Sequence, residues 1–500
     1  MTDVLLTHSN HLLNDAKQLR KMQPYPPLGT LYAATALRCA GISVAVFDTT
    51  FAAPMPGFID ALEKHQPKIV VIYEDDFNFV TKMCLAHMRD LANQLSAIAR
   101  SKGIITIAHG SDATDHPRKY FDSGVDYVLN GEAEQILTDL CTTLLLSQKP
   151  GDIPGLVHST SAGKTLRKVD NAPKNPSWVN LPRVARDLID IEPYRQVWTQ
   201  KHGYFSTNVV SSRGCPYRCN WCAKPISGDK FHVRSPEDVA AEMHELKELY
   251  GINHIWFGDD VFALSHHWVE AFANAVELHS EPVPFKIQSR ADLMSEATVS
   301  ALKRAGCTEV WMGVESGSQK ILDAMGKGLK LSAVHTARER LAKAGIRACY
   351  FLQFGYPGEG WDEICDTIKL VRATRPDDIG VSISYPLPGT SFFAHVQAQL
   401  GRKRNWTDSD DLCAIFTASY TDEFYLALRD ALHAEVAEWH ASTTSTTSSK
   451  SSKSLWRRVF EMEPVSLNPN ALSLPRDPSL EDSQSVFIPV ENLVLKTEGA

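Results

Sequence analysis

The sequence predicts an α/β protein with a Rossmann-like, doubly wound parallel sheet, then a partial (β/α)6 barrel, and a helical C-terminal extension. Residues 1–150 alternate short apolar runs with helical patterns, which is typical of parallel strand–helix units. From about residue 206 the strand–helix units become longer, and six strands can be placed. Three cysteines, Cys215, Cys219 and Cys222, follow the first strand of this second series.

The first 150 residues are a predicted ligand-binding domain. Lys68–Tyr73 is a nearly continuous apolar run, as expected of a strand that is buried on both faces. The other strands are expected at Val4–Leu6, Val44–Phe47, Ile104–Ala108 and Asp126–Leu129, and helices at Leu28–Cys39 and along the apolar face of Cys84, Met88, Leu91, Leu95 and Ile98. In such sheets ligands bind at the carboxyl ends of the strands. Neither a dinucleotide G-x-G-x-x-G nor a phosphate-binding G-x-x-x-x-G-K-[ST] is present, which argues against NAD and nucleoside triphosphates.

Changes in pattern set the predicted domain boundaries. Residues 151–205 are polar and rich in proline and form a predicted linker, with a hairpin at Leu156–His158 and Thr165–Val169. The barrel is expected at 206–395 and a helical segment at 396–441. Residues 442–500 form a low-complexity tail that is expected to be mobile.

The polar clusters of the second half all follow predicted strands. They are Gly258-Asp259-Asp260, Ser289-Arg290, Gly313 to Gly317, Gly355 to Glu359 and Ser384 to Pro388. The loops at the carboxyl ends of barrel strands converge on one mouth. We therefore expect these side chains to surround the cysteine loop.

The cysteine spacing C-x3-C-x2-C indicates an iron–sulfur site. Three thiolates this close in a loop can bind three irons of a 4Fe–4S cube and leave the fourth iron without a protein ligand. A structural zinc ion requires four ligands, and the nearest histidines, His202 and His232, do not stand at a familiar zinc spacing. The remaining cysteines are expected to be core or surface thiols: Cys39, Cys84, Cys141, Cys307, Cys349, Cys365 and Cys413.

Composition narrows the class of protein. The formal charge of −8 argues against an electrostatic nucleic-acid footprint. The N-terminus lacks the features of a signal peptide, and no apolar run reaches the roughly 18 residues that a membrane span needs. The sequence therefore predicts a cytoplasmic protein without a membrane span.

Together these motifs resemble a known family. The cysteine loop is similar to that of radical S-adenosylmethionine (SAM) enzymes. Finer features resemble the subgroup with an N-terminal cobalamin-binding domain, the class B radical SAM methyltransferases: Tyr25 to Leu31, Ser212 to Pro216, Gly258 to Phe262, Gly313 to Ser318 and Phe354 to Glu359. The resemblance covers roughly residues 20–395.

The resemblance implies roles for individual residues. Cys215, Cys219 and Cys222 would bind a 4Fe–4S cluster, and SAM would bind its free iron. The implied SAM contacts are Asp259 and Asp260 for the amino group, Ser289 and Arg290 for the carboxylate, Glu315 and Ser316 for the ribose, and Gln353 and Gly355 for the adenine. Loop position alone makes Ser111 and Glu132 the expected cobalamin contacts. No further catalytic residue can be assigned.

One departure concerns the cobalt ligand. Cobalamin domains of the methionine-synthase type carry D-x-H-x-x-G, whose histidine ligates cobalt, whereas this chain has Asp48-Thr49-Thr50-Phe51 after its second strand. Two interpretations stay open: cobalamin bound without a histidine ligand, and a domain that has lost cobalamin.

The resemblance also implies an activity. The reduced cluster would cleave SAM to a 5′-deoxyadenosyl radical, and cobalamin would supply a methyl group to an unactivated carbon of a small-molecule or natural-product substrate. The alternatives are cyclisation, ring rearrangement or oxygen insertion. A methylthiotransferase acting on tRNA or protein is disfavoured. That family carries three more cluster cysteines in its N-terminal domain, whereas Cys39, Cys84 and Cys141 of this chain do not form such a set. The expected partner is an external one-electron donor such as a flavodoxin or ferredoxin.

Overall fold

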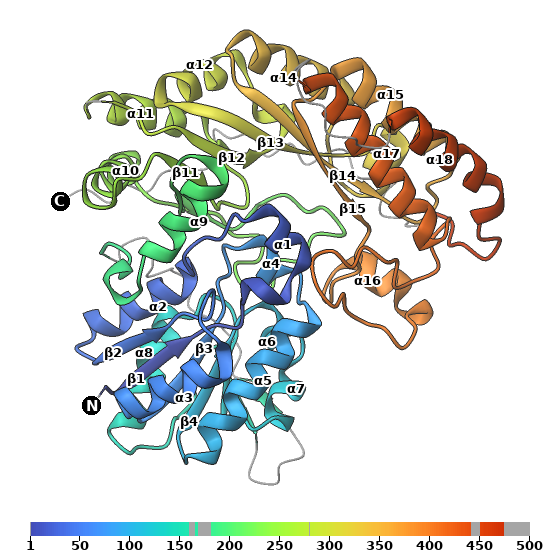
Figure 1. The fold of residues 1–500 in the computed structure, drawn as a ribbon. Helices are drawn as coiled ribbons and strands as arrows, with labels where there is room; N and C mark the ends of the chain where they lie inside the picture. The colour runs from blue at the N-terminus through green and yellow to red at the C-terminus, as the bar shows by residue number, and fades with distance from the viewer. Residues whose placement is uncertain (1, 160–165, 169–181, 280, 442–450, 475–500) are drawn as a thin grey trace.

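The structure is a computed structural model and describes residues 2–159, 166–168, 182–279, 281–441 and 451–474. Two large sheets, each flanked by helices, dominate the molecule (Figure 1). The N-terminal sheet lies in one half and the second sheet in the other. This arrangement confirms the predicted fold class.

The N-terminal sheet has the order β2-β1-β3-β4-β5-β6-β7, and its first five strands are parallel. The strands are β1 Val4–Thr7, β2 Val44–Phe47, β3 Ile69–Tyr73, β4 Ile105–His109, β5 Tyr127–Leu129, β6 Leu156–Ser159 and β7 Leu166–Lys168. All five residues of β3 are buried, as expected for a central strand with helices on both faces. The predicted hairpin is confirmed as β6 and β7, which extend the sheet antiparallel to β5.

Helices cover both faces of this sheet. One core contains α2 and α8 side chains and the other contains α3 and α5 side chains. The helices are α1 Ala16–Lys21, α2 Leu28–Cys39, α3 Pro54–His65, α4 Phe79–Lys82, α5 Ala86–Ser101, α6 Ser111–Asp115, α7 Pro117–Asp122 and α8 Glu134–Leu145. The helix expected to include Cys84 begins only at Ala86, because Cys84 has a left-handed backbone (φ 53°) that separates α4 from α5.

The second sheet is a six-stranded parallel sheet with the order β15-β14-β13-β12-β11-β8. Its strands are β8 Ser206–Val209, β11 His254–Phe257, β12 Phe285–Ser289, β13 Cys307–Glu315, β14 Arg347–Phe354 and β15 Asp378–Ile383. The helices between them are α10 Pro236–Tyr250, α11 His266–Glu277, α12 Glu296–Ala305, α13 Gln319–Ala324, α14 Leu331–Lys343 and α15 Trp361–Thr374. Helix α10 is capped at both ends, since the Ser235 hydroxyl accepts the Asp238 N–H at 3.2 Å and Gly251 ends the helix with a left-handed backbone.

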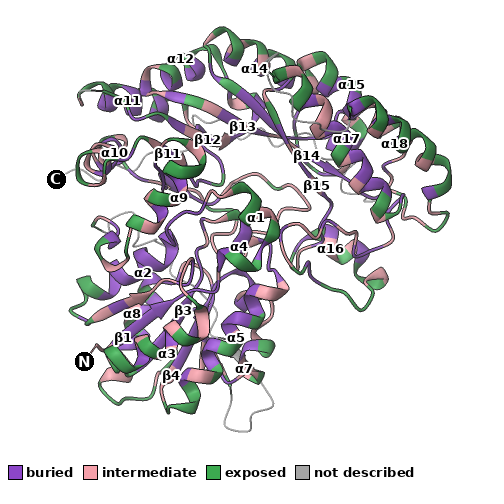
Figure 2. Cartoon of the chain, in the orientation of Figure 1, coloured by how far each residue is buried: buried purple, intermediate pink, exposed green. Residues whose placement is uncertain are grey.

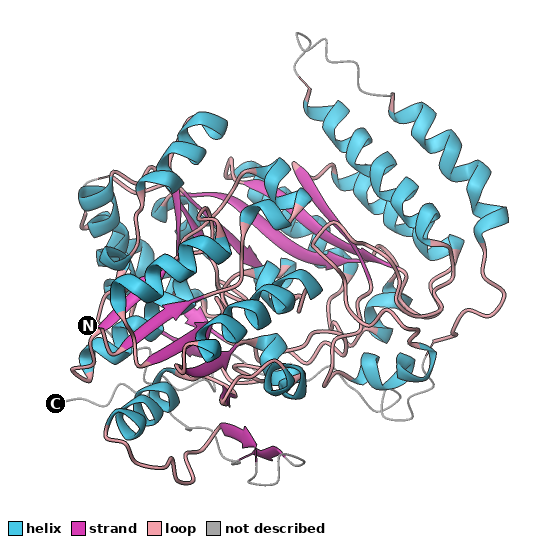
Figure 3. Cartoon of the chain, turned by 60° about the horizontal axis from the view of Figure 1, so that its bottom comes forward, coloured by secondary structure: helices cyan, strands magenta, loops and turns pink. Residues whose placement is uncertain are grey.

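The linker and the C-terminal extension contain helices of their own. The linker includes α9, Glu192–His202, and the extension contains α16 Ser391–Val396, α17 Asp422–His440 and α18 Ser452–Ser466. The prediction of a low-complexity tail over 442–500 is wrong for α18, which lies beside α17 (Figure 3). Trp456 and Val459 are buried in that contact, so these two apolar residues anchor an otherwise polar segment. Residues 442–450 and 475–500 lie outside the described part of the chain.

The two sheets approach each other through the loops at the carboxyl ends of their strands. The loop after β3 and the start of α8 contact the loops after β8 and β11 through two ion pairs, Lys82–Asp260 and Arg213–Glu134. This junction, which we call the seam, combines buried strand ends with loops of intermediate exposure (Figure 2). No helix among the described residues is both long and apolar enough to cross a bilayer.

Candidate functional site

The three cysteines lie in one loop at the seam. The loop is closed by a short antiparallel pair, β9 Ser212–Arg213 and β10 His232–Val233. Gly214 has φ 81°, and a Cβ there would lie 2.0 Å from the Lys230 carbonyl oxygen, so glycine is required at the entrance to the loop. The thiols of Cys215, Cys219 and Cys222 are partly buried and face one another closely enough to interact electrostatically.

Hydrogen bonds fix the shape of the cysteine loop. The Lys224 ammonium donates to the carbonyl oxygens of Cys215 (2.9 Å) and Tyr217 (2.6 Å). Asn220 donates its N–H to the Met325 carbonyl at 2.9 Å and accepts the Tyr356 hydroxyl at 3.1 Å. Lys224 therefore braces the loop from within, and Asn220 attaches it to the segments after α13 and β14.

The three thiols need not converge on one metal ion to bind a cluster. Among the described residues no three Cys, His, Asp or Glu side chains converge on a point where they could hold one metal ion. In a 4Fe–4S cube each thiolate binds a different iron, so the sulfurs need not converge.

Asp259 and Asp260, predicted as a pair of SAM contacts, face different surroundings. Asp259 is fully buried and accepts the Ser211 N–H (3.1 Å) and the hydroxyls of Ser211 and Ser212. Burial raises its pKa to about 6. Asp260 is partly exposed, accepts the Gly214 N–H at 3.1 Å and pairs with Lys82, so only Asp260 faces the cysteine loop with an accessible carboxylate.

Ser289 and Arg290 lie next to the cysteine loop, and both already have protein partners. The Ser289 hydroxyl donates to the Phe262 carbonyl at 2.7 Å. The Arg290 guanidinium forms two 3.0 Å hydrogen bonds to Asp292 and stacks 3.8 Å from the Tyr217 ring centroid. A ligand carboxylate at this place would share the guanidinium with Asp292.

Glu315 and Ser316 also separate in the structure. Glu315 has a left-handed backbone (φ 63°) and accepts the Lys327 ammonium at 2.8 Å, with both side chains buried. Lys327 also lies 5.9 Å from the Trp221 ring centroid, beside the cysteines. Ser316 instead lies 3.3 Å from the Thr367 hydroxyl and accepts the Ser318 N–H, which is a local structural role.

Gln353 lies near the end of strand β14 and Gly355 directly follows the strand. The C-terminal extension covers this region. The Gln353 amide donates to the Ser384 hydroxyl at 2.9 Å. Gly355 donates its N–H to Glu359 at 2.6 Å, and burial raises the pKa of Glu359 to about 8. The Gly358 N–H donates to the Leu472 carbonyl at 2.9 Å, so the segment after α18 covers this loop.

The carboxyl edge of the N-terminal sheet carries a row of buried polar atoms without hydrogen-bond partners among the described residues. Both predicted contacts belong to it, the Ser111 hydroxyl and Glu132 Oε1. The other members, which no sequence motif marks, lie at or after the ends of β3, β4 and β5: Asp75 Oδ2, Asp76 Oδ1, His109 Nδ1, Thr114 Oγ1, Asp115 Oδ2, His116 Nε2 and Asn130 Oδ1. We call this row the polar edge. Burying such groups without partners is costly, which points to a bound polar ligand.

Histidines near the polar edge are engaged with protein groups. His8 lies 3.0 Å from Asp48 Oδ1 and 3.1 Å from the Thr49 hydroxyl through its two ring nitrogens. His109 Nε2 lies 3.0 Å from the Gly131 carbonyl oxygen, and its Nδ1 lies 3.4 Å from Asp76 Oδ2. Both ring nitrogens of His8 therefore have protein partners, whereas His109 Nδ1 has no hydrogen-bond partner among the described residues.

Two ion pairs join the polar edge to the cysteine loop. Arg213 forms two hydrogen bonds with Glu134, one of them 3.0 Å long, and both side chains are at most 7% exposed. Arg213 directly precedes Gly214, and its guanidinium also lies 4.7 Å from the Phe77 ring centroid. The second pair is Lys82–Asp260, whose carboxylate also binds Gly214.

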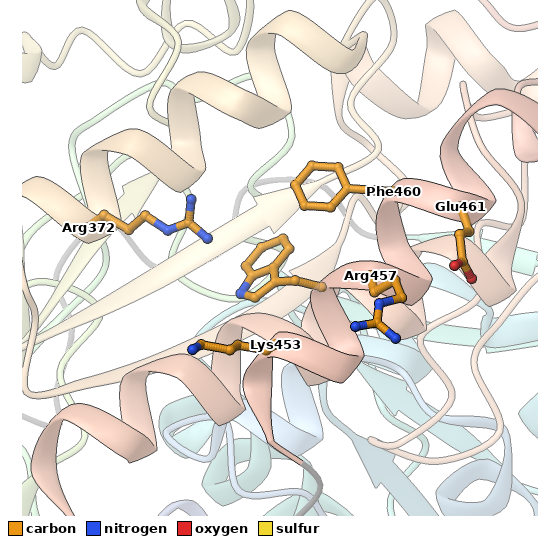
Figure 4. A pocket seen from close by; sticks show the side chains of 6 residues that line it. Arg372, Lys453, Arg457, Phe460 and Glu461 are labelled. Atoms are coloured by element: carbon orange, nitrogen blue, oxygen red, sulfur yellow. The ribbon is translucent and has the colours of Figure 1, made fainter.

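Two open hollows lie apart from the cysteine loop. One, of about 530 Å³, is on α18 between Trp456, Phe460 and Arg372 (Figure 4). The other, of about 600 Å³, lies between α7 and the 402–407 segment and is lined by Lys119 and Arg402 to Arg404. Neither includes a predicted site residue.

Family models match both halves of the chain. Residues 22–141 match the B12 binding domain, and residues 209–371 match the radical SAM superfamily. The matches contain the polar edge and the cysteine loop, respectively.

Individual relatives agree with these matches. An uncharacterised methyltransferase of Pyrococcus horikoshii is 29% identical over 56% of this chain and 60% of its own length. A hopanoid C-3 methylase of Methylococcus capsulatus is 25% identical over 75% of this chain and 69% of its own. The chain thus spans less than two thirds of the first of these relatives.

Solved structures share the fold. The radical SAM methyltransferase TsrM from Kitasatospora setae, solved with cobalamin and a 4Fe–4S cluster, has a TM-score of 0.65 at 20% identity, over 80% of this chain and 75% of its own. OxsB, a cobalamin-dependent radical SAM enzyme solved with aqua-cobalamin and SAM, has a TM-score of 0.68 at 16% identity, over 93% of this chain and 71% of its own. With its B12-binding and radical SAM domains in this order, the chain belongs to the radical SAM superfamily, in the group that carries an N-terminal cobalamin-binding domain.

Proposed function

We propose that this protein is a cobalamin-dependent radical SAM enzyme that methylates an unactivated carbon of a small-molecule substrate. The observation that carries the proposal is the seam. There, a loop with three cysteines and a row of unpartnered polar atoms lie on facing strand ends, joined by two ion pairs. A radical SAM domain implies a 4Fe–4S cluster and SAM, and a B12-binding domain implies cobalamin.

The residues of the cysteine loop fit a cluster. Three thiols stand together, and Trp221 and Tyr217 flank them in the loop. The Trp221 indole N–H has no partner among the described residues, although it is buried. Cys215, Cys219 and Cys222 would hold the cluster, Asp260 would bind the amino group of SAM, and Arg290 its carboxylate.

The polar edge fits cobalamin. The corrin ring carries amide side chains, which donate N–H groups, and the edge presents unpartnered carboxylate oxygens of Asp75, Asp76, Asp115 and Glu132. The two engaged ring nitrogens of His8, which contacts Asp48 and Thr49 after the second strand, favour the interpretation in which cobalamin binds without a histidine ligand from that loop.

When bound, the reduced cluster supplies one electron, SAM a carbon-centred oxidant and cobalamin a transferable methyl group. The chain's own residues orient these groups and exclude water. Glu134 and Arg213 attach the stem of the cysteine loop, which is the β9–β10 pair, to the N-terminal domain. Lys327 binds Glu315 at the mouth of the barrel. An external one-electron donor, such as a flavodoxin or ferredoxin, is the expected partner.

An anaerobic assay tests the proposal. Cluster-reconstituted, cobalamin-loaded protein should form 5′-deoxyadenosine and methionine from SAM when a chemical reductant is supplied. Methyl transfer is followed with methyl-labelled SAM and candidate acceptors. No SAM cleavage by fully loaded protein would overturn the proposal, and cleavage without label transfer to any acceptor would favour ring rearrangement or oxygen insertion.

A further inference from the structure

Lys82 is a cation at the meeting point of the two domains. It is the last residue of α4, in the connection that follows β3 of the N-terminal sheet. Its ammonium pairs with Asp260 of the barrel, and the two side chains are 31% and 29% exposed. Neither the family resemblance nor the matches assign it a role.

Asp260 has two kinds of partner in this structure. One oxygen accepts the Gly214 N–H at 3.1 Å, which ties Asp260 to the cysteine loop. The other oxygen holds the Lys82 ammonium. Since Asp260 is also the implied acceptor for the amino group of SAM, Lys82 occupies the place of that N–H donor.

A second carboxylate is available to Lys82 on the other side of the seam. Asp76 is buried, and its Oδ1 has no hydrogen-bond partner among the described residues. Burial lowers the pKa of Lys82, but negative charge, mainly that of Asp260 and to a smaller extent that of Asp76, raises it and prevails. Asp76 belongs to the polar edge, and its other oxygen lies 3.4 Å from His109.

We propose that Lys82 competes with the amino group of SAM for Asp260 and turns to Asp76 when SAM binds. The inference rests on SAM binding in the proposed function and adds a device to it. The Lys82 ammonium would thus move from Asp260, at the proposed SAM site, to Asp76, on the polar edge. SAM arrival thereby changes the charge that faces cobalamin, and Lys82 acts as a positioning residue for both cofactors.

The dissociation constant of SAM tests this competition. It is measured by equilibrium dialysis with labelled SAM on cluster-reconstituted, cobalamin-loaded protein. Lys82→Met and Lys82→Gln remove the competitor and should bind SAM about fivefold more tightly. Lys82→Arg keeps the cation and should bind SAM no more tightly than the wild type. If Lys82 had only a structural role, Lys82→Met and Lys82→Gln would bind SAM more weakly than the wild type.

A matched control is Lys68→Met, which removes another lysine–aspartate pair of the same domain, Lys68–Asp3 at 2.9 Å, and should leave SAM affinity unchanged. Iron content and unfolding midpoint are measured for every variant, and Lys82→Gln serves if Lys82→Met folds poorly. Equal or weaker SAM binding by both neutral variants overturns the inference.

Asp76→Asn tests the second half of the exchange. It should weaken SAM binding in the wild type, because the displaced ammonium loses its acceptor, and should have no such effect in Lys82→Met. An equal effect in both backgrounds would contradict the exchange. If the wild type binds no SAM at all, the proposed function fails together with this inference. Normal SAM cleavage with unchanged affinities overturns the inference alone.

Discussion

Single carboxylates at the barrel mouth differ in charge because their surroundings differ. Asp260 stays partly exposed and pairs with a lysine, whereas Glu359 is fully buried and, among the described residues, accepts the Gly355 N–H. Burial raises the pKa of Glu359 to about 8. Glu359 is therefore protonated at neutral pH in the folded protein.

This protonation gives a pH dependence that can be measured. The pKa of Glu359 is raised in the folded state, so its contribution to stability is present at low pH and is lost as pH rises toward about 8. In that range the free energy of unfolding should fall by about 1 kcal/mol per pH unit. Glu359→Gln should remove this part of the slope. Urea unfolding of both proteins between about pH 5 and 8 checks it, and parallel slopes would contradict the assignment.

Asp259 and Asp260 should respond differently to the same substitution. Asp259→Asn replaces an acceptor of three hydrogen bonds from Ser211 and Ser212, so it should reduce stability by about 1–3 kcal/mol. Asp260→Asn should weaken SAM binding with little effect on stability. Chemical unfolding and SAM dialysis on both variants separate the two roles. Equal loss of SAM affinity with equal stability would show that both side chains contact SAM.

At the scale of residues, the sequence could predict which residues lie at the site but not which of two neighbours contacts protein groups and which stays accessible. The dipeptide at 259 and 260 follows β11, and only the turn of the backbone decides that Asp259 points to Ser211 and Asp260 to the loop. Ser316 was expected at the ribose, yet its hydroxyl lies against Thr367, a residue 51 positions away. No sequence motif marks the unpartnered oxygens of Asp75 and Asp76, because the absence of a hydrogen-bond partner depends on how the folded chain packs around them.

At the scale of elements, the cysteine loop depends on its stem. Strand β9 is only two residues long, and it pairs with an equally short β10. Such a pair is weak by itself. The Arg213–Glu134 ion pair attaches β9 to the first residue of α8 and so fixes the short strand pair to the N-terminal domain. A carboxylate at a helix N-terminus is also favoured by the helix dipole.

Glu134→Gln should therefore loosen the stem. It removes one charged partner of the buried Arg213 guanidinium, and breaking a buried ion pair typically costs about 3–5 kcal/mol. Both the free energy of unfolding and the iron bound after reconstitution should fall. The control is Asp187→Asn, which removes an exposed ion pair to Arg38 and should change stability by about 0.5 kcal/mol or less. Wild-type iron content in Glu134→Gln would contradict a role for the stem in cluster binding.

Elements with a strong hydrophobic period were predictable, and those set by single residues were not. Strand β3 and helix α2 match their expected bounds closely, since their apolar pattern alone defines them. The expected helix through Cys84 ignored its left-handed backbone, which no periodicity shows. Helix α18 was missed because the serine-rich run before it masks the spacing of Trp456, Val459 and Phe460.

At the scale of the molecule, function depends on how two sheets face each other. Parallel sheets bind ligands at the carboxyl ends of their strands, and here these ends meet at one seam. Two cofactors bound to such edges would be neighbours. The sequence predicts each sheet, but their mutual placement rests on pairs such as Lys82–Asp260, whose members lie 178 positions apart.

The cofactor content of the anaerobically reconstituted protein tests this arrangement most directly. Iron, sulfide and corrinoid are measured for the wild type and for the variant with Cys215, Cys219 and Cys222 all changed to Ala. The wild type should bind about four irons and an equimolar amount of cobalamin. The variant should lose the iron and SAM cleavage but keep the corrinoid. Iron retained by the variant, or a wild type that binds no corrinoid, would contradict the account.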